Sequence, residues 1–145
     1  MENIFRLMKN LPIEILEKIL IETDNFELCV LFNHWYPLRY ITNSMDIAAK
    51  NGHLDIVKYL YLNGKNCTIN AIDYASENGH LDVVKYLCKV NKFCTSNAMD
   101  LAIKNNHLDV LKFLYSIRKF FSLNSMNLAV KNGNVHIIKY IYSNV

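Results

Sequence analysis

One ten-residue phrase occurs four times in this chain at a fixed spacing. Its first copy reads Asn-Gly-His-Leu-Asp-Ile-Val-Lys-Tyr-Leu, and the copies begin at Asn51, Asn78, Asn105 and Asn132. Each copy therefore starts 27 residues after the one before it. A constant period of this size is typical of a repeat array, in which every unit stacks on its neighbours. The chain is expected to form a solenoid.

Each repeat is predicted to contain two short helices joined by a tight turn. The first half ends at a residue that accepts the left-handed backbone found after many helices, which favours glycine and then asparagine. These residues are Gly52, Gly79, Asn106 and Gly133. An alanine recurs in the first half, where it lets two helix backbones approach closely; the four are Ala48, Ala75, Ala102 and Ala129. The predicted fold class is all-α.

Length and composition fit one folded array. The 145 residues are 52% hydrophobic and 20% charged, with a net charge of +3, which permits an acidic partner without demanding one. No apolar run approaches the roughly 18 residues of a membrane span. The first ten residues lack the features of a secretory signal. We therefore expect a cytoplasmic protein with no membrane partner.

The four cysteines are expected to be reduced thiols, as is usual for such a protein. Cys67 and Cys94 lie one period apart, while Cys29 and Cys88 have no equivalent cysteine one repeat away. Stacked helices lie about 8–10 Å apart, whereas the α-carbons of a disulfide lie about 4.4–6.8 Å apart. The four cysteines form no CxxC pair, so nothing in their spacing suggests a metal site.

The sequence predicts neither an enzyme nor a cofactor-binding protein. None of the common nucleotide-binding, serine-hydrolase or zinc-protease motifs is present. His53, His80 and His107 recur at the repeat period, but one repeat is too wide for them to share a metal ion. We expect these histidines to bond backbone groups in the turns.

Two surfaces of the array are candidate protein-binding sites. The first helices present a charged position that differs between copies, which suits a binding surface as well as plain solubility. Its residues are Lys50, Glu77, Lys104 and Lys131. The loops between repeats mix basic and aromatic residues, which suits an acidic peptide or, less favoured, single-stranded nucleic acid. Those residues are Lys92, Phe93, Arg118, Lys119 and Phe120. Alternatively, the aromatic side chains tuck under the loops as core.

The two ends of the array carry more apolar surface than stacking requires. The helix that begins at Pro12 has apolar residues over roughly 160°, whereas a core-facing stripe spans nearer 100°. It serves either as a cap for the array or as a docking helix. In the last repeat, Ile137, Ile138 and Ile141 keep the internal pattern. This predicts an exposed apolar end or self-association through the C-terminal repeat.

The repeated phrase resembles the turn and second helix of ankyrin repeats. Asn70–Ala75 occupies the place of that family's Thr-Pro-Leu-His-x-Ala. The resemblance implies helix pairs that bind proteins, but each unit is shorter than the family's roughly 33 residues. The deficit falls in the segment 65–69, where the family builds a β-hairpin finger, so these fingers are expected to be absent. The family's histidine is replaced by Asp46, Asp73, Asp100 and Asn127.

The N-terminal segment is similar to an F-box. The resemblance rests on Leu-Pro-Ile-Glu-Ile-Leu from Leu11 to Leu16 and on Trp35. It implies a substrate adaptor that docks on a Skp1-type protein of a cullin ubiquitin ligase, through Leu11, Pro12, Ile13, Leu16 and Leu20. This combination also resembles proteins of large DNA viruses of amoebae, which would place the protein in the host cytoplasm.

The alternative is a simple binding scaffold whose first helices only cap the array. Under either interpretation, residues 1–41 form the N-terminal helical segment. Residues 42–145 form four repeats, at about 43–69, 70–96, 97–123 and 124–145.

Overall fold

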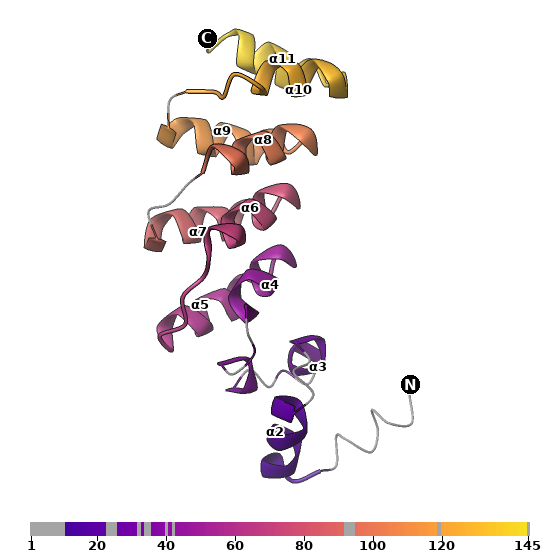
Figure 1. Ribbon diagram of the computed structural model, residues 1–145, viewed down its shortest axis with the longest axis vertical. Coiled ribbons are helices and arrows are strands. Elements are labelled where there is room, and N and C mark those ends of the chain that lie inside the picture. Colours follow the sequence, from indigo (N-terminus) through magenta and orange to yellow (C-terminus); the bar gives the residue numbers. More distant parts are fainter. Residues whose placement is uncertain are drawn as a thin grey trace.

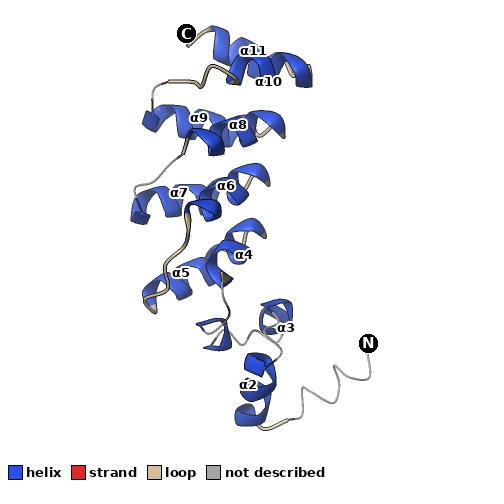
Figure 2. Cartoon of the chain, viewed as in Figure 1, coloured by secondary structure: helices blue, strands red, loops and turns tan. Residues whose placement is uncertain are grey.

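The computed structural model describes residues 11–144, apart from 23–25, 32, 34, 35, 40, 42, 92–94 and 119. Within these residues the chain forms ten α-helices and one 3-10 helix, with no strand (Figure 2). This confirms the predicted all-α class. Trp35, on which the F-box resemblance partly rests, lies outside the described residues.

The helices stack as four successive pairs beyond a short N-terminal segment (Figure 1). The N-terminal segment contains α2 (Ile13–Glu22), α3 (Phe26–Leu31) and the 3-10 helix η1 (Tyr36–Arg39). The pairs are α4 (Ser44–Lys50) with α5 (Leu54–Leu62), α6 (Ile69–Glu77) with α7 (Leu81–Asn91), α8 (Ser96–Lys104) with α9 (Leu108–Arg118), and α10 (Ser125–Asn132) with α11 (Val135–Tyr142). In Figure 1, α2 and the α10–α11 pair lie at opposite ends of the stack.

The first helices of successive pairs form the most tightly packed row of the stack. The contacts of α6 with α4 and α8 are more extensive than those of α7 with α5 and α9. The recurring alanine makes this possible, since Ala48, Ala75, Ala102 and Ala129 are all fully buried. Because first helices approach each other more closely than second helices, they line the inner, concave side of the stack.

The turn inside each pair has the predicted left-handed residue. Gly52 has a φ of 75° and Asn106, which replaces glycine in the third copy, has a φ of 67°. The backbone N–H of His53 then donates to the carbonyl of Ala48 at 2.9 Å, and the two following repeats have the equivalent bond at the same length. The turn therefore fixes the angle between the two helices of the first three pairs in the same way.

The N-terminal segment shares one hydrophobic core with the array. Leu20 of α2 and Phe26 and Cys29 of α3 are buried together with the apolar faces of α5, α7, α9 and α11. The segment therefore caps the first repeat. The connections between pairs are short and contain no strand where they are described, so the predicted absence of β-hairpin fingers is confirmed. No helix of the described chain has the length and apolar character needed to cross a membrane.

The expectation of four reduced thiols is wrong for Cys88, which is disulfide-bonded. Cys29 and Cys67 are thiols, and Cys94 lies outside the described residues. The expectation considered only the distance between equivalent positions in neighbouring repeats. That distance says nothing about a bond between non-equivalent positions.

Candidate interaction surface

Three rows of side chains cover the concave face of the first helices. Their members lie at positions i, i+4 and i+7 of each repeat, which share one face of a helix. An exposed asparagine row contains Asn43, Asn70, Asn97 and Asn124. An apolar row of partly exposed side chains contains Ile47, Tyr74, Leu101 and Leu128, and the charged row contains Lys50, Glu77, Lys104 and Lys131. The charged row was predicted from the sequence, and the apolar row lies between it and the asparagine row along each helix.

The asparagine and apolar rows were missed by the sequence analysis, although the signal was present. Asparagine recurs at position 43 and its three equivalents with the same 27-residue period as the repeated phrase. It was overlooked because it lies just before or within the first turn of each first helix, outside that phrase. A comparison of all 27 positions across the copies would have found it.

The rows enclose a hollow of about 300 Å³ between α4 and α6. Asn43, Ile47 and Lys50 line one side, and Asn70 and Tyr74 line the other. The Lys50 ammonium lies over the Tyr74 ring, 5.7 Å from its centroid. The hollow therefore offers amide, apolar and cationic groups at one place, which suits contact with a peptide chain.

Carboxylates beneath this surface fix each first helix to the next. Asp46 is buried and accepts hydrogen bonds from the Thr68 backbone N–H at 3.0 Å and from the Thr68 hydroxyl at 2.7 Å. The same Thr68 oxygen accepts from the Asn70 N–H and so caps α6. Each carboxylate thus holds the residue that starts the following first helix.

The next two interfaces repeat this arrangement, with each aspartate again 22 residues before its hydroxyl partner. Asp73 accepts from the Thr95 hydroxyl, which caps α8, and from the Asn97 side-chain amide, both at 2.5 Å. Asp100 accepts from the hydroxyls of Ser122 and Ser125 at 2.7–2.9 Å. The exposed rows therefore lie on helices that these hydrogen bonds fix to one another.

The histidines of the second and third copies of the phrase are also structural. The His80 ring donates from Nε2 to the carbonyl of Lys50 at 3.0 Å, and the His107 ring donates to the carbonyl of Glu77 at 3.1 Å. Both bonds connect one turn to the preceding repeat. This confirms the prediction of a backbone bond for His80 and His107, whereas the printed contact of the His53 ring is with the Phe26 ring.

Two of the asparagines that open the phrase, Asn105 and Asn132, are not part of a free binding face. Asn105 donates from its side-chain amide to the carbonyl of Glu77 at 2.8 Å. Asn132 donates to the carbonyl of Lys104 at 2.5 Å. These amides join repeats, whereas the binding candidates are the rows described above.

Residues 45–127 match the ankyrin-repeat family as three copies. The chain is an ankyrin-repeat protein. The match covers more than half of the chain, and an array of ankyrin repeats is a protein–protein interaction module, typically without catalytic activity. No curated protein matches this chain. The matched residues begin at Met45, so the F-box resemblance gains no support from the comparison, and neither does a viral origin.

This ankyrin-repeat protein departs from its family at the inter-repeat hydrogen bond. Aspartate stands in place of the family's Thr-Pro-Leu-His histidine at Asp46, Asp73 and Asp100. The side chain at that position still bonds, because the carboxylate accepts from hydroxyls of the following repeat. The substitution changes the bonding groups and preserves the connection.

The predicted basic and aromatic loops are only partly described. Lys92, Phe93 and Lys119 lie outside the described residues. Phe120 is half exposed, and the guanidinium of Arg118 lies 4.8 Å from its ring centroid.

The next residue along, Phe121, is partly buried and its ring stacks on Tyr115 with centroids 4.5 Å apart. The Phe121 ring therefore packs against the array, whereas the Phe120 ring faces solvent.

The predicted docking residues of the N-terminal segment occupy different environments. Pro12 and Ile13 are exposed, Leu11 and Leu16 are partly buried, and Leu20 is fully buried. Leu20 is therefore inaccessible to a partner while the cap is folded. Exposed apolar surface on α2 comes from Ile13, Ile15 and Ile21.

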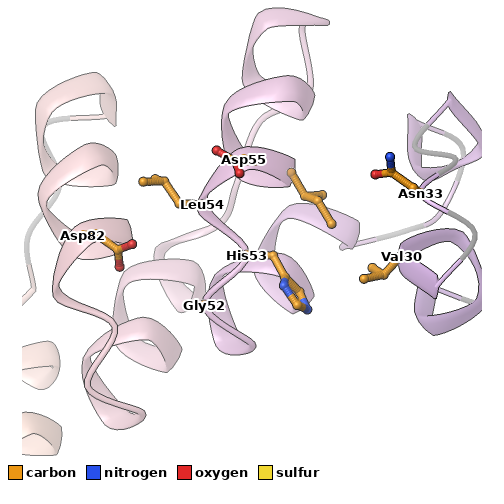
Figure 3. Close-up of a pocket in the computed structure, with 8 residues that line it drawn as sticks. Val30, Asn33, Gly52, His53, Leu54, Asp55 and Asp82 are labelled. Carbon is orange, nitrogen blue, oxygen red and sulfur yellow. The ribbon is translucent and has the colours of Figure 1, made fainter.

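A second hollow, of about 400 Å³, lies where the cap meets the first repeat (Figure 3). Val30 and Asn33 line it from the cap, His53 and Asp55 from the first repeat, and Asp82 from the second. The His53 ring lies beside the Phe26 ring, with centroids 6.2 Å apart. Among the described residues no group of three or more His, Cys, Asp or Glu is placed to hold a metal ion. We assign this hollow to the imperfect fit between the cap and the array.

Proposed function

We propose that this protein binds a partner protein through the concave face of α4, α6, α8 and α10. The observation that carries the proposal is the hollow between α4 and α6, with exposed amide, apolar and charged rows above the buried Asp46–Thr68 bond. A fixed framework reduces the ordering cost of binding, because the side chains are held by elements that are already rigid.

The charges of this face favour an acidic partner. Three of the four members of the charged row are exposed lysines, namely Lys50, Lys104 and Lys131, and the fourth is Glu77. A cationic face steers acidic partners toward it and disfavours basic ones. The partner segment that fits best carries acidic side chains opposite the lysines and an apolar side chain opposite Tyr74.

The test compares two double charge reversals on the same array. Lys50→Glu with Lys104→Glu alters the concave face, whereas Lys58→Glu with Lys112→Glu alters exposed positions on the second helices. Tagged variants are compared with the unaltered chain in quantitative capture from cell extract. We expect one set of proteins to be lost with the concave variant and retained with the other. Equal retention by both variants would overturn the concave-face proposal.

A narrower proposal concerns α2. The exposed Ile13 and Ile15 support docking of a Skp1-type adaptor, so that the array would hold a substrate for a ubiquitin ligase. Titration of a purified Skp1-type protein tests this role directly. Binding that is lost with Ile13→Asp and kept with Leu62→Asp supports it, since Leu62 is even more exposed than Ile13 but lies on α5. Absence of binding by the native chain would rule the adaptor role out.

A further inference from the structure

The α10–α11 pair exposes apolar positions whose equivalents in the preceding repeat are buried. Val130 is 60% exposed, whereas Ile103, the equivalent residue of the preceding repeat, is fully buried. Ile138 is partly exposed where the equivalent Leu111 is fully buried. The buried equivalents lie in the repeat on which α10 and α11 stack, so the exposed positions of α10 and α11 form a face of the same kind.

A hollow beside this face adds to its apolar area. It has a volume of about 570 Å³ and is lined by Phe120, Leu123, Met126 and Ile141 among others. Leu123 is fully exposed, and Met126 is partly exposed although the equivalent Met99 is buried. Contiguous exposed apolar surface of this kind marks an interaction site in a soluble protein.

Every charged side chain in the C-terminal quarter of the chain is basic. From Val110 to Val145 there are five lysines and arginines and no aspartate or glutamate. Lys131 and Lys139 are exposed on α10 and α11. Two copies of this end placed face to face would bring like charges together, which costs free energy. The surface that complements it is apolar and acidic.

The opposite end of the same molecule has that character. Ile13, Ile15 and Ile21 of α2 are exposed, with the first two 55% and 47% accessible. Five acidic residues and one lysine lie between Leu11 and Leu31. Glu14 and Glu22 are exposed on the same helix as the isoleucines. The two ends therefore match in both polarity and charge.

We infer that a second copy of this chain docks head to tail, with the outer face of α2 on the open end formed by α10 and α11. The two surfaces lie at opposite ends of the stack (Figure 1), so each docked copy leaves one of each kind free. Such a heterologous contact extends into a linear assembly unless its rotation closes a ring. Further copies continue the stack beyond the fourth repeat.

The test uses two variants, each blocked at one end. Ile15→Lys places a cation on the acidic outer face of α2, called the head, and Val130→Glu places an anion on the basic end formed by α10 and α11, called the tail. Both sites are exposed in the single chain, so folding should be unaffected, and thermal unfolding followed by circular dichroism verifies this. Leu62→Lys and Leu62→Glu make matched changes on α5, away from both ends.

Analytical ultracentrifugation gives the decisive readout. The unaltered chain and the Leu62 variants should form species larger than a dimer as concentration rises. Each blocked variant alone should be monomeric. An equimolar mixture of the two should form a dimer and nothing larger, because one intact tail meets one intact head. Raising the salt to about 1 M should weaken the association several-fold, since the Debye length falls to about 3 Å.

Several outcomes would overturn the inference. A native chain that is still monomeric at about 1 mM has no specific contact of this kind. Association that survives Ile15→Lys excludes α2, and a mixture that stays monomeric excludes the head-to-tail arrangement. If either variant unfolds, Ile21→Lys and Leu123→Glu replace it at neighbouring exposed positions.

Two comparisons separate this contact from the functions proposed above. A Skp1-type adaptor would use the same isoleucines but not the C-terminal end, so Val130→Glu would leave adaptor binding intact. The concave charge reversals Lys50→Glu and Lys104→Glu should leave self-association unchanged. Loss of self-association with those concave variants would contradict docking by the two ends.

Discussion

The imidazole ring of His80 lies against the α-carbon of Gly52 in the preceding repeat. A Cβ on Gly52 would come within 2.6 Å of Nδ1 of that ring, while Nε2 donates to the carbonyl of Lys50. The His107 ring has the same relation to Gly79. At the third interface both members change together, to Asn106 and Asn134. Glycine is therefore required in the first two turns by the neighbouring ring as well as by the left-handed backbone.

Replacement of Gly79 by alanine should destabilise the protein more than replacement of Gly133. Both residues have a positive φ, of 76° and 65°, so both variants carry the roughly 1–2 kcal/mol cost of a left-handed alanine. Only at Gly79 does the added methyl meet a ring, which should cost about 1–3 kcal/mol more. Urea unfolding of the two variants measures the difference.

The same pair permits a double-mutant cycle. His107→Asn should recover part of the stability lost in Gly79→Ala, because the third interface already combines asparagines at these two positions. If the losses from Gly79→Ala and His107→Asn simply add, the contact with the ring is not the constraint.

Loss of the buried carboxylate of Asp73 should weaken the interface between the second and third repeats. Asp73→Ala leaves the Thr95 hydroxyl and the Asn97 amide without their shared acceptor. Hydrogen bonds to charged groups contribute about 1.5–3 kcal/mol, and we expect a loss of that size in chemical denaturation. Asp82→Ala, at an exposed position in the first turn of α7, should cost less than about 1 kcal/mol.

Truncation of a core leucine tests the packing of the second helices. Leu87 is fully buried in α7, so Leu87→Ala should lower the free energy of unfolding by about 2–5 kcal/mol. Leu62→Ala removes the same atoms from a side chain that is 81% exposed, and its effect should stay within about 0.5 kcal/mol. Comparable losses would mean that α7 does not pack as described.

Stability should fall in alkaline solution, in part through Cys67. Burial, and then the nearby Asp46 carboxylate, raise the pKa of this thiol above its ordinary value of 9.0. Above pH 9 the unfolded chain has lost this proton while the folded chain retains it, so the contribution to stability is complete below that pH and is lost as the pH rises further.

Urea midpoints measured between pH 8 and pH 10 would follow this loss, and Cys67→Ala should reduce it. The native thiol should also react with iodoacetamide more slowly than the same thiol in urea, because the thiolate is the nucleophile. Equal rates in both states would contradict a raised pKa.

The period and the small residues were enough to predict the fold. Ala48 and its equivalents indicated close helix contact, and Gly52 and Asn106 indicated the turns, because these features depend on backbone geometry within one repeat. The partner of His80 could not be predicted in the same way, since the carbonyl of Lys50 lies 30 residues earlier and its position depends on how the repeats stack. The bond between Asp46 and Thr68 depends on stacking for the same reason.

The ends of the molecule were less predictable than its middle. An arc of apolar residues on α2 was evident from the sequence, but it did not distinguish Leu20, which is buried, from Ile13, which is exposed. That distinction is set by η1, which packs on α2 and on α3 without any repeat to define its position. The disulfide at Cys88 was missed because no periodic position accounts for it.

The spacing of the inter-repeat bonds has a consequence for the length of the protein. At successive interfaces the aspartate carboxylate accepts a hydrogen bond from a hydroxyl 22 residues later in the chain. The histidine ring donates to a carbonyl 30 residues earlier. Removal of residues 69–95 deletes one period and joins Thr68 to Ser96. Thr68 would then cap α8, and the His107 ring would take the place of the His80 ring over Gly52.

The shortened chain should fold cooperatively, with unchanged helix content per residue by circular dichroism and a lower unfolding midpoint, because one interface is lost. A deletion of 26 or 28 residues at the same place should fail to fold. A chain of this architecture can therefore gain or lose whole repeats. Each new interface then joins residues that already make the equivalent contact in another repeat.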